Sequence, residues 1–449
     1  MSLEIIILIT FILGYTAITL EHSLRIDKLI PALLMMCICW AIIAVGMDGF
    51  NNWFDPGSSK ILDISSLGHE SRQHLLEGTL LHHFGKTAEI LIFLMGAMAI
   101  VEMIDHFEGF SAIKKFIKTK KKLSLLWIIS FLAFFLSSII DNLTATIVLI
   151  TILRKLINDS NDRMWFSGFI IIAANAGGAW TPIGDVTTTM LWMAGKVTTL
   201  ELMKLLFIPS LLNILIPLLI GSFLPVFKGN VPVIEEKQTV NKTASLMLVL
   251  GLILIIFVPV FKTLTHLPPY IGMMLSLSLF AIIAEIISNR QISFTQPDEK
   301  ENLHDSKGPT MKALTKIEMP SILFFLGILM TVAAMESLGM IFNFGQFVNG
   351  EIDSNLFVTL LGASSAIIDN VPLVAASIGM FSDLTQDNHT WHFIAYAAGT
   401  GGSMLIIGSA AGVVAMGMEK ISFFWYLKNI TFIAFLGYIG GVIAYLVLN

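Results

Sequence analysis

Runs of about twenty apolar residues recur along the chain, and each is long enough to cross the hydrocarbon core of a bilayer as a helix. Charged residues make up only 13% of the 449 residues, about half of the roughly 25% that is typical of soluble domains. So few charges would not cover the surface of a soluble protein of this length. The sequence therefore predicts an all-α polytopic membrane protein, with helical runs at 3–20, 29–46, 89–105, 203–225, 244–261, 270–288, 319–341 and 423–447.

The charges and the cysteines exclude other classes of protein. The formal net charge is −5, so the chain lacks the basic surface that nucleic acid requires. Cys37 and Cys39 both lie inside an apolar run, which excludes a disulfide framework and disfavours a cysteine metal site. The first run follows Glu4 rather than a basic segment, and we expect a retained helix instead of a signal peptide. The expected partner is the lipid bilayer.

Four further apolar stretches are longer and carry polar residues or glycines in their middle, where lipid tolerates them least. They come in two pairs, at 123–157 and 163–195, then at 355–382 and 391–418. The polar segments between the runs are too short for folded domains and lie at 47–86, 226–243 and 289–318. We therefore predict one membrane domain made of two halves, 1–225 and 244–449, joined by a linker at 226–243.

The two halves repeat each other. The motif SSIIDN at 137–142 recurs as SAIIDN at 365–370, and AANAGG at 173–178 recurs as AAGTGG at 397–402. The order of the motifs is the same and the interval between the copies is nearly constant. This pattern indicates an internal duplication.

Positive charge predicts the orientation of each copy, because short cytoplasmic loops are rich in Lys and Arg. Six lysines lie between 114 and 122, ahead of the first motif, and more basic residues follow it at Arg154, Lys155 and Arg163. No Lys or Arg occurs between Lys316 and Lys420. The ends of the first motif are therefore expected in the cytoplasm and those of the second outside, which predicts an inverted repeat.

Segment 123–157 has basic residues near both ends and is too long for one crossing. It predicts a re-entrant helical hairpin with its tip at Asp141 and Asn142, and 355–382 predicts a second hairpin with its tip at Asp369 and Asn370. Non-helical backbone at this depth is tolerated only where it is buried in protein or lines a wet cavity. The alternative is a pair of ordinary helices joined by a polar turn at the surface.

The two tip aspartates are the first candidate site residues. A carboxylate near the bilayer centre costs roughly 2.5–3.5 kcal/mol on insertion scales and is a functional hypothesis by default. An asparagine follows each acid, and its amide can bind a cation or hold a carboxylate. Ser137 and Ser365 precede the acids by one helical turn on the same face, and Thr144 follows the first acid.

The second constellation lies in 163–195, where Asn175-Ala-Gly-Gly-Ala-Trp-Thr-Pro-Ile-Gly-Asp185-Val-Thr187-Thr188 interrupts the apolar stretch. Glycines and proline break a helix, so an unwound transmembrane helix is expected in each copy. Oxygen ligands of this kind suit a hard cation. The second copy, in 391–418, keeps the glycines and Ser403 but has Ser409 in place of Asp185. Close helix packing is an equal alternative for that copy.

Other acids lie within or beside the apolar runs, at Glu89, Glu102, Asp105, Glu285 and Glu336. Asp105 and Glu336 occupy matching positions of the repeat. Both lie near the ends of expected helices, so a solvated interfacial position is at least as compatible with them as a role in transport.

The segments SSIIDNLTAT and AANAGGAWTPIGDVTTTMLW resemble the NhaD-type sodium/proton antiporters of the ion transporter superfamily. The resemblance implies a bacterial inner-membrane antiporter built from inverted repeats, with a transport domain that moves relative to a scaffold, as in an elevator, often in a homodimer. It also implies roles in exchange for Ser137, Asp141, Asn142, Asn175, Asp185, Thr187, Thr188, Ser365, Asp369 and Asn370.

We expect exchange of cytoplasmic Na⁺ or Li⁺ for external H⁺ by alternating access, with no cofactor. A buried carboxyl favours its protonated form when it is empty and its ionised form when a cation is bound. Asp141, with Asp369 or Asp185, would bind the cation or the proton, and Thr144 and Ser403 complete the candidate site. The expected Na⁺ ligands are Asp141, Asn142, Asn175, Asp185, Asp369 and Asn370.

Three alternatives remain at this point. A sodium-coupled dicarboxylate carrier or an arsenite carrier of the same superfamily would share the architecture, although acids at both tips would repel an anion. An ion channel is disfavoured by the paired broken helices. An enzyme is disfavoured because the sequence has no zinc-protease motif and no paired catalytic acids at the spacing of a membrane protease.

Overall fold

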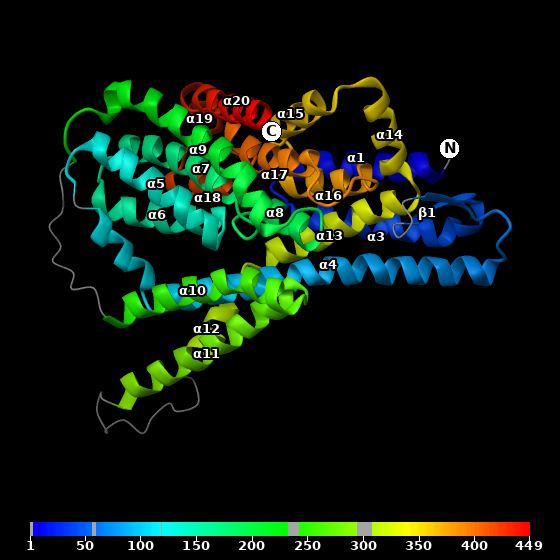
Figure 1. Cartoon of the computed structure of the whole chain (residues 1–449), viewed down its shortest axis with the longest axis horizontal. Coiled ribbons are helices and arrows are strands. Elements are labelled where there is room, and N and C mark those ends of the chain that lie inside the picture. The colour runs from blue at the N-terminus through cyan, green and yellow to red at the C-terminus, as the bar shows by residue number, and fades with distance from the viewer. Residues whose placement is uncertain (1–2, 56–59, 118, 232–241, 294–307) are drawn as a thin grey trace.

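The computed structural model describes residues 3–55, 60–117, 119–231, 242–293 and 308–449, and these fold almost entirely into helices (Figure 1). The first half contains α1 (Leu3–Thr19), α2 (Glu21–Leu24), α3 (Leu29–Gly46), α4 (His69–His106), α5 (Lys122–Ile140), α6 (Asn142–Leu156), α7 (Ser160–Gly178), α8 (Val186–Met193) and α9 (Thr199–Phe223). The second half contains α10 (Lys242–Thr265), α11 (Pro269–Ser293), α12 (Pro309–Lys316), α13 (Met319–Ser337), α14 (Met340–Glu351), α15 (Ser354–Ser364), α16 (Asn370–Met380), α17 (His389–Gly401), α18 (Ala410–Glu419), α19 (Phe423–Asn429) and α20 (Thr431–Leu448).

Short elements complete the described chain. Strands β1 (Asn52–Asp55) and β2 (Lys60–Asp63) pair antiparallel. Four 3₁₀ helices lie at Met47–Gly49, Gly109–Phe116, Pro225–Phe227 and, as η4, at Gly402–Met404. The predicted linker 226–243 falls partly outside the described residues.

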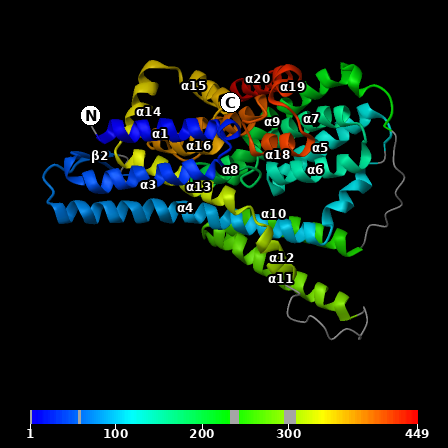
Figure 2. The ribbon, with the colours of Figure 1, turned by 180° about the vertical axis from the view of Figure 1, so that it is seen from behind.

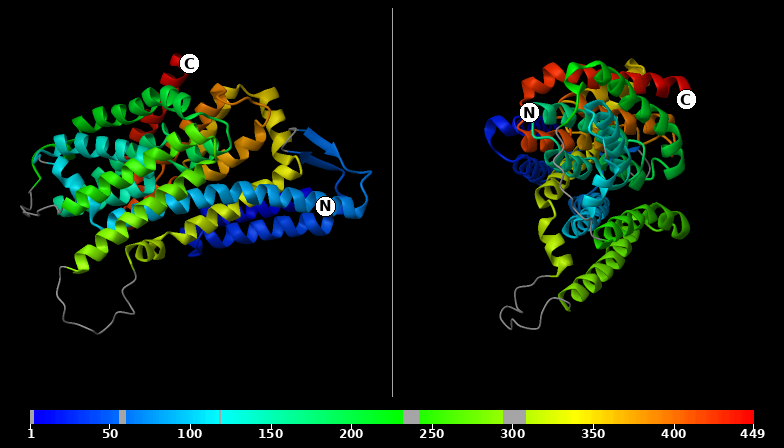
Figure 3. Two further views of the ribbon diagram at one scale, coloured as in Figure 1. Left: turned by 60° about the horizontal axis from the view of Figure 1, so that its bottom comes forward. Right: turned by 90° about the vertical axis from the view of Figure 1, so that its left-hand side faces the viewer.

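Within the described residues, eight helical segments have the length and the apolar composition to cross a membrane. They are Leu29–Gly49, His69–His106, Lys122–Ile140, Thr199–Phe223, Lys242–Thr265, Pro269–Asn289, Met319–Ser337 and Thr431–Leu448. The chain is thus a multi-pass membrane protein. Helices α10 and α11 pack against α4, and α11 projects from the rest of the molecule (Figures 2 and 3).

Helix α4 is 38 residues long and extends beyond the apolar run 89–105. The interpretation of 47–86 as a loop was wrong for residues 69–86, which form the first half of this helix. Those residues mix polar and apolar side chains and are mostly exposed, and a search for apolar runs does not detect a helix of that kind.

Two predicted runs are each divided between two helices. Run 319–341 contains all of α13 and the start of α14, with Gly339 between them at φ 71°. Glycine adopts this left-handed conformation without strain because it has no Cβ. Run 423–447 is divided between α19 and α20 at Ile430.

Each candidate hairpin and each candidate broken helix consists of two helices joined by a short break. Helices α5 and α6 pack against each other and meet at Asp141. Helices α15 and α16 flank a turn that ends at Asp369. Residues 179–185 connect α7 to α8, and η4 with the following residues connects α17 to α18. The second tip differs from the first because five residues, 365–369, separate its helices.

Glycines of the repeated motif allow close approach of backbones. A Cβ added to Gly177 of α7 would overlap the carbonyl of Phe134 in α5, and one added to Gly401 of α17 would overlap the carbonyl of Gly362 in α15. Gly177 and Gly401 are matching residues of the two sequence copies. Each broken helix therefore packs against the first arm of its own hairpin through a small-residue contact.

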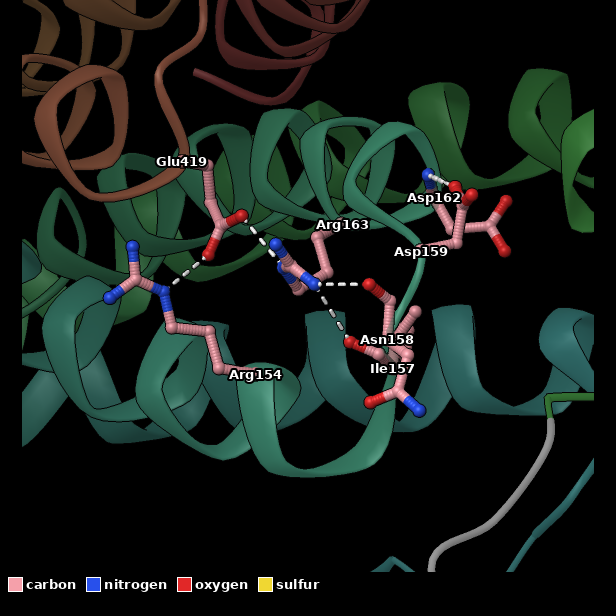
Figure 4. A network of polar contacts seen from close by, with 7 residues as sticks. All are labelled: Arg154, Ile157, Asn158, Asp159, Asp162, Arg163 and Glu419. Carbon is pink, nitrogen blue, oxygen red and sulfur yellow. Dashed lines mark hydrogen bonds and ion pairs between the residues drawn. The ribbon is translucent and has the colours of Figure 1, made fainter.

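The two broken helices run antiparallel. At one end, Glu419 closes α18 and forms ion pairs with Nε of Arg154 and of Arg163, each at 2.7 Å (Figure 4). At the other end, the backbone N–H of Asp387, just before α17, donates to the carbonyl of Lys196, just after α8, at 2.8 Å. An inverted repeat requires this arrangement; the repeat boundaries and their orientation in the membrane stay predictions.

Candidate cation site

Three helices begin where the hairpin tips meet the first broken helix, and an aspartate is the N-cap of each. Asp141 precedes α6, Asp185 precedes α8 and Asp369 precedes α16. The N-terminal end of a helix dipole favours a negative charge. Asp141 accepts from the backbone N–H of Thr144 at 2.8 Å and Asp369 from that of Val371 at 3.2 Å. Asp185 makes no side-chain capping bond, and its carboxylate accepts from side-chain donors instead.

Asp185 is the point where these elements converge. Its side chain accepts from the Thr187 hydroxyl at 2.6 Å, from Nδ2 of Asn142 at 3.2 Å and from Nδ2 of Asn370 at 3.3 Å. The two asparagines come from opposite hairpin tips, and Asp185 itself is 3% exposed. A carboxylate is costly to bury unless it is hydrogen-bonded, and here each half of the protein supplies an amide donor.

Asn175 connects this centre to the second broken helix. Nδ2 of Asn142 also donates to Oδ1 of Asn175 at 3.0 Å, and Nδ2 of Asn175 donates to the Ser409 hydroxyl at 3.0 Å. Ser409 is the N-cap of α18 with φ −146° and ψ 153°, and Asp185 has φ −146° and ψ 151°. The two residues therefore occupy matching backbone positions, and only the first copy carries an acid there.

A cavity of about 70 Å³ lies beside these groups, and we call it the cation cavity. Its charged lining residues are Lys28, Asp141, Asp185 and Asp369, and Asn142 and Asn370 also line it. Within the described residues, no three acidic, histidine or cysteine side chains are grouped closely enough to hold a metal ion together. The side-chain oxygens that line the cation cavity include those of the aspartates and of the amides of Asn142 and Asn370.

The tip at Asp141 has an unusual backbone. Its φ is 78° and its ψ is 157°, a region that residues other than glycine rarely adopt and that is associated with strain at functional sites. Both carboxylate oxygens contact Thr144, through the backbone N–H at 2.8 Å and through the hydroxyl at 2.9 Å. Thr144 thus holds the Asp141 side chain in place. Asp369 has an ordinary φ of −50°.

Lys28 is the site residue that sequence reasoning missed. Its ammonium lies 3.3 Å from Oδ2 of Asp369 and 4.3 Å from the centre of the Phe324 ring. In the sequence it is one of several charges at the start of an apolar run, where a lysine ordinarily extends toward the interface. No local pattern separates it from Arg25 or Asp27.

Several predicted residues do not face the cation cavity. The hydroxyls of Ser137 and Ser365 donate to the carbonyls of Ala174 and Ala398, at 2.6 and 3.0 Å, and so fasten each hairpin to its broken helix. The Thr188 hydroxyl donates to the backbone carbonyl of Asp185 at 2.9 Å rather than to its carboxylate.

Ser403 makes its polar contacts with α17 and α19. Its hydroxyl donates to the Thr400 carbonyl at 2.7 Å, and its own carbonyl accepts from Tyr426 at 2.7 Å. Among the described residues, Ser403 does not line the cation cavity. It belongs to the packing of the second broken helix.

Residues 8–392 match the model of a family described as citrate transporter. Sodium/proton antiporter 1 of Arabidopsis thaliana is 41% identical, over 99% of this chain and 73% of its own length. The Na⁺/H⁺ antiporter NhaD of Vibrio cholerae is 32% identical, over 98% of this chain and 91% of its own.

Among solved structures, the YdaH transporter of Alcanivorax borkumensis aligns with a TM-score of 0.58 at 11% identity, over 92% of this chain and 97% of its own. That likeness shows a shared fold. The family is described as one of transporters. The match to the family model and the sequence relatives together show that this chain belongs to the citrate-transporter family. Within that family, it belongs to the NhaD-type sodium/proton antiporters.

Proposed function

We propose that this protein exchanges cytoplasmic Na⁺ or Li⁺ for external H⁺ by alternating access, with Asp185 as the carboxylate that holds one or the other. The observation that carries the proposal is the convergence of Thr187, Asn142 and Asn370 on this one buried acid. The relatives named sodium/proton antiporters support the same activity.

Asn142 and Asn370 allow Na⁺ and H⁺ to compete for the Asp185 carboxylate. In the present arrangement their Nδ2 atoms donate to Asp185. Rotation of an amide about its last side-chain bond replaces the NH₂ donor by the carbonyl oxygen. Asn142 and Asn370 would then turn their oxygens toward a cation bound at the carboxylate. The same shell can in this way hold an ionised carboxylate alone or a carboxylate with Na⁺, and protonation of Asp185 releases the cation.

The alternative of a dicarboxylate or arsenite carrier is not favoured by the charge or the size of the cation cavity. Three aspartates and one lysine line it, so its lining is negative overall. Its volume of about 70 Å³ is far below the roughly 300–1,000 Å³ of ordinary small-molecule sites. A cation with a few waters fits this space better than a polycarboxylate does.

The proposal is tested with Asp185→Asn in inverted membrane vesicles that carry a pH-gradient dye. The variant keeps the size of the side chain but has no charge, so Na⁺-dependent dequenching should be lost. Asp63→Asn, at an exposed position of β2, is the matched control and should exchange normally. Retention of exchange by Asp185→Asn would contradict the role of this carboxylate.

A complementary measurement uses a bacterium that lacks its own sodium antiporters. Expression of the unaltered chain should restore growth at high Na⁺ and alkaline pH, and a dicarboxylate carrier would not. The bacterial inner membrane as its location and the homodimer stay predictions, since the relatives include proteins of a plant as well as of bacteria.

A further inference from the structure

A second cavity of about 300 Å³ lies between α4, α8, α13 and α16, and we call it the second cavity. Its charged and titratable lining residues are His82, His83, Lys86, Glu89, Lys196 and Glu336. None of them contacts the cation cavity. The proposed exchange site makes no use of this group of side chains.

The second cavity and the cation cavity are stacked along the same four helices. On each helix, a residue of one cavity is followed within about one turn, roughly 5 Å of helix, by a residue of the other. These pairs are Ile90 and Phe93 on α4, Thr189 and Met190 on α8, Phe325 and Leu329 on α13, and Val371 and Ala375 on α16. A septum at most about one helical turn thick therefore separates the two cavities.

The order of the lining residues along α4 and α13 indicates toward which side of the membrane each cavity lies. On α4 the cation cavity is nearer the C-terminal end, which leads toward the lysines between 114 and 122. On α13 it is nearer the N-terminal end, which follows Lys316. Both ends are cytoplasmic under the positive-inside rule. The second cavity lies toward the opposite ends of both helices, so it faces the other side of the membrane.

Glu336 is the acid of the second cavity that is best placed to accept a proton. It lies on α13, and its carboxyl group rests against Gly379 of α16. Among the described residues, its carboxylate forms no hydrogen bond and no ion pair within 4.0 Å, whereas Glu89 lies 4.0 Å from Lys86 at the rim. Lys196 lines the same cavity and stacks 4.7 Å from the centre of the Trp391 ring.

We propose that the second cavity is the access path to the exchange site from outside, and that Glu336 is its proton acceptor. This rests on the proposed antiport. A proton taken from water by the Glu336 carboxylate would pass to Asp185 when the septum rearranges. His82, His83, Lys86 and Glu89 of α4 and Lys196 after α8 face the same space and set the electrostatic field around it, while α16 contributes only uncharged lining residues.

Access is tested with cysteine labelling, which does not depend on exchange. Cys37 and Cys39 are first replaced by Ser. Ala333→Cys then reports on the second cavity, Ala97→Cys on the cation cavity, and Ala284→Cys, fully buried on α11, on neither. A membrane-impermeant thiol reagent should label Ala333→Cys from outside only and Ala97→Cys from inside only. Labelling of both positions from the same side would overturn the proposal even if antiport is present.

The role of Glu336 is tested in right-side-out vesicles of Glu336→Gln. The control is Glu70→Gln, at an exposed position in the first turn of α4 that does not line the second cavity. The external proton concentration at half-maximal exchange should rise several-fold in Glu336→Gln, while the internal Na⁺ concentration at half-maximal exchange is unchanged. Glu336→Asp should restore much of the proton response. An unaltered proton response in Glu336→Gln would overturn the assignment. Loss of exchange in the unaltered chain would instead contradict the antiport itself.

Discussion

The ammonium of Lys28 lies 3.3 Å from the carboxylate of Asp369, at the place where the cation cavity meets a side cavity of about 300 Å³. Both side chains line both cavities, and they are 26% and 22% exposed. The pair joins the start of α3 to the tip of the second hairpin. The Lys28 ammonium is thus paired with a carboxylate to which a transported cation would also bind.

Replacing Lys28 by Met should lower the Na⁺ concentration that gives half-maximal exchange. The lysine and Na⁺ compete for the same negative charge, and a partly exposed ion pair contributes about 1 kcal/mol, or roughly fivefold in affinity. Dequenching measured against Na⁺ concentration gives the result. Lys86→Met removes a lysine of the second cavity and should leave this value unchanged; an equal effect of both variants would argue against competition at Asp369.

Replacing Thr187 by Val should move the pH of half-maximal exchange upward. Its hydroxyl donates to the Asp185 carboxylate at 2.6 Å and so favours the ionised form over the protonated one. A hydrogen bond to a charged group contributes roughly 1.5–3 kcal/mol, which corresponds to about one to two pH units. Loss of the donor strengthens proton binding, so a higher pH is needed to free the site.

The neighbouring Thr188→Val is a matched control for that experiment. Its hydroxyl donates to the backbone carbonyl of Asp185, so its loss leaves the donors to the carboxylate unchanged. The pH profile of Thr188→Val should stay close to that of the unaltered protein. Equal shifts in both variants would point to a general change in the structure around α8.

Replacing Gly177 by Ala should destabilise the packing of α7 on α5. The new Cβ would overlap the carbonyl of Phe134, and overpacking of this kind costs about 1–3 kcal/mol. Thermal unfolding of the purified protein in detergent should show a lower midpoint. Gly85→Ala, on α4 with open space around it, should leave the midpoint unchanged or raise it.

Replacing Glu419 by Gln should weaken the contact between the two broken helices. Its side chain is 1% exposed and pairs with Arg154 and Arg163. Removing one partner of a fully buried ion pair costs about 3–5 kcal/mol. Because the Arg154 side chain is 45% exposed and solvent screens that pair, we expect a smaller loss of about 2 kcal/mol. The midpoint of thermal unfolding in detergent measures it. Glu351→Gln, exposed at the end of α14, should have no effect.

Much of the candidate site was predictable because local sequence decides where helices break. The glycines and Pro182 between α7 and α8 end one helix and start another, and the repeat pointed to the corresponding break before α18. The first half of α4 was not predictable in the same way, since its residues 69–86 are held in a helix without an apolar run.

The sequence by itself determined the membrane class, and it predicted that the three acids lie where helices break, because hydropathy and backbone preference act over a few residues. Only the tertiary structure decided which groups meet. Asn370 reaches Asp185 across 185 residues, and Lys28 reaches Asp369 across 341. Such pairs depend on how the hairpins and helices pack together, and the types and spacing of neighbouring residues do not specify that packing.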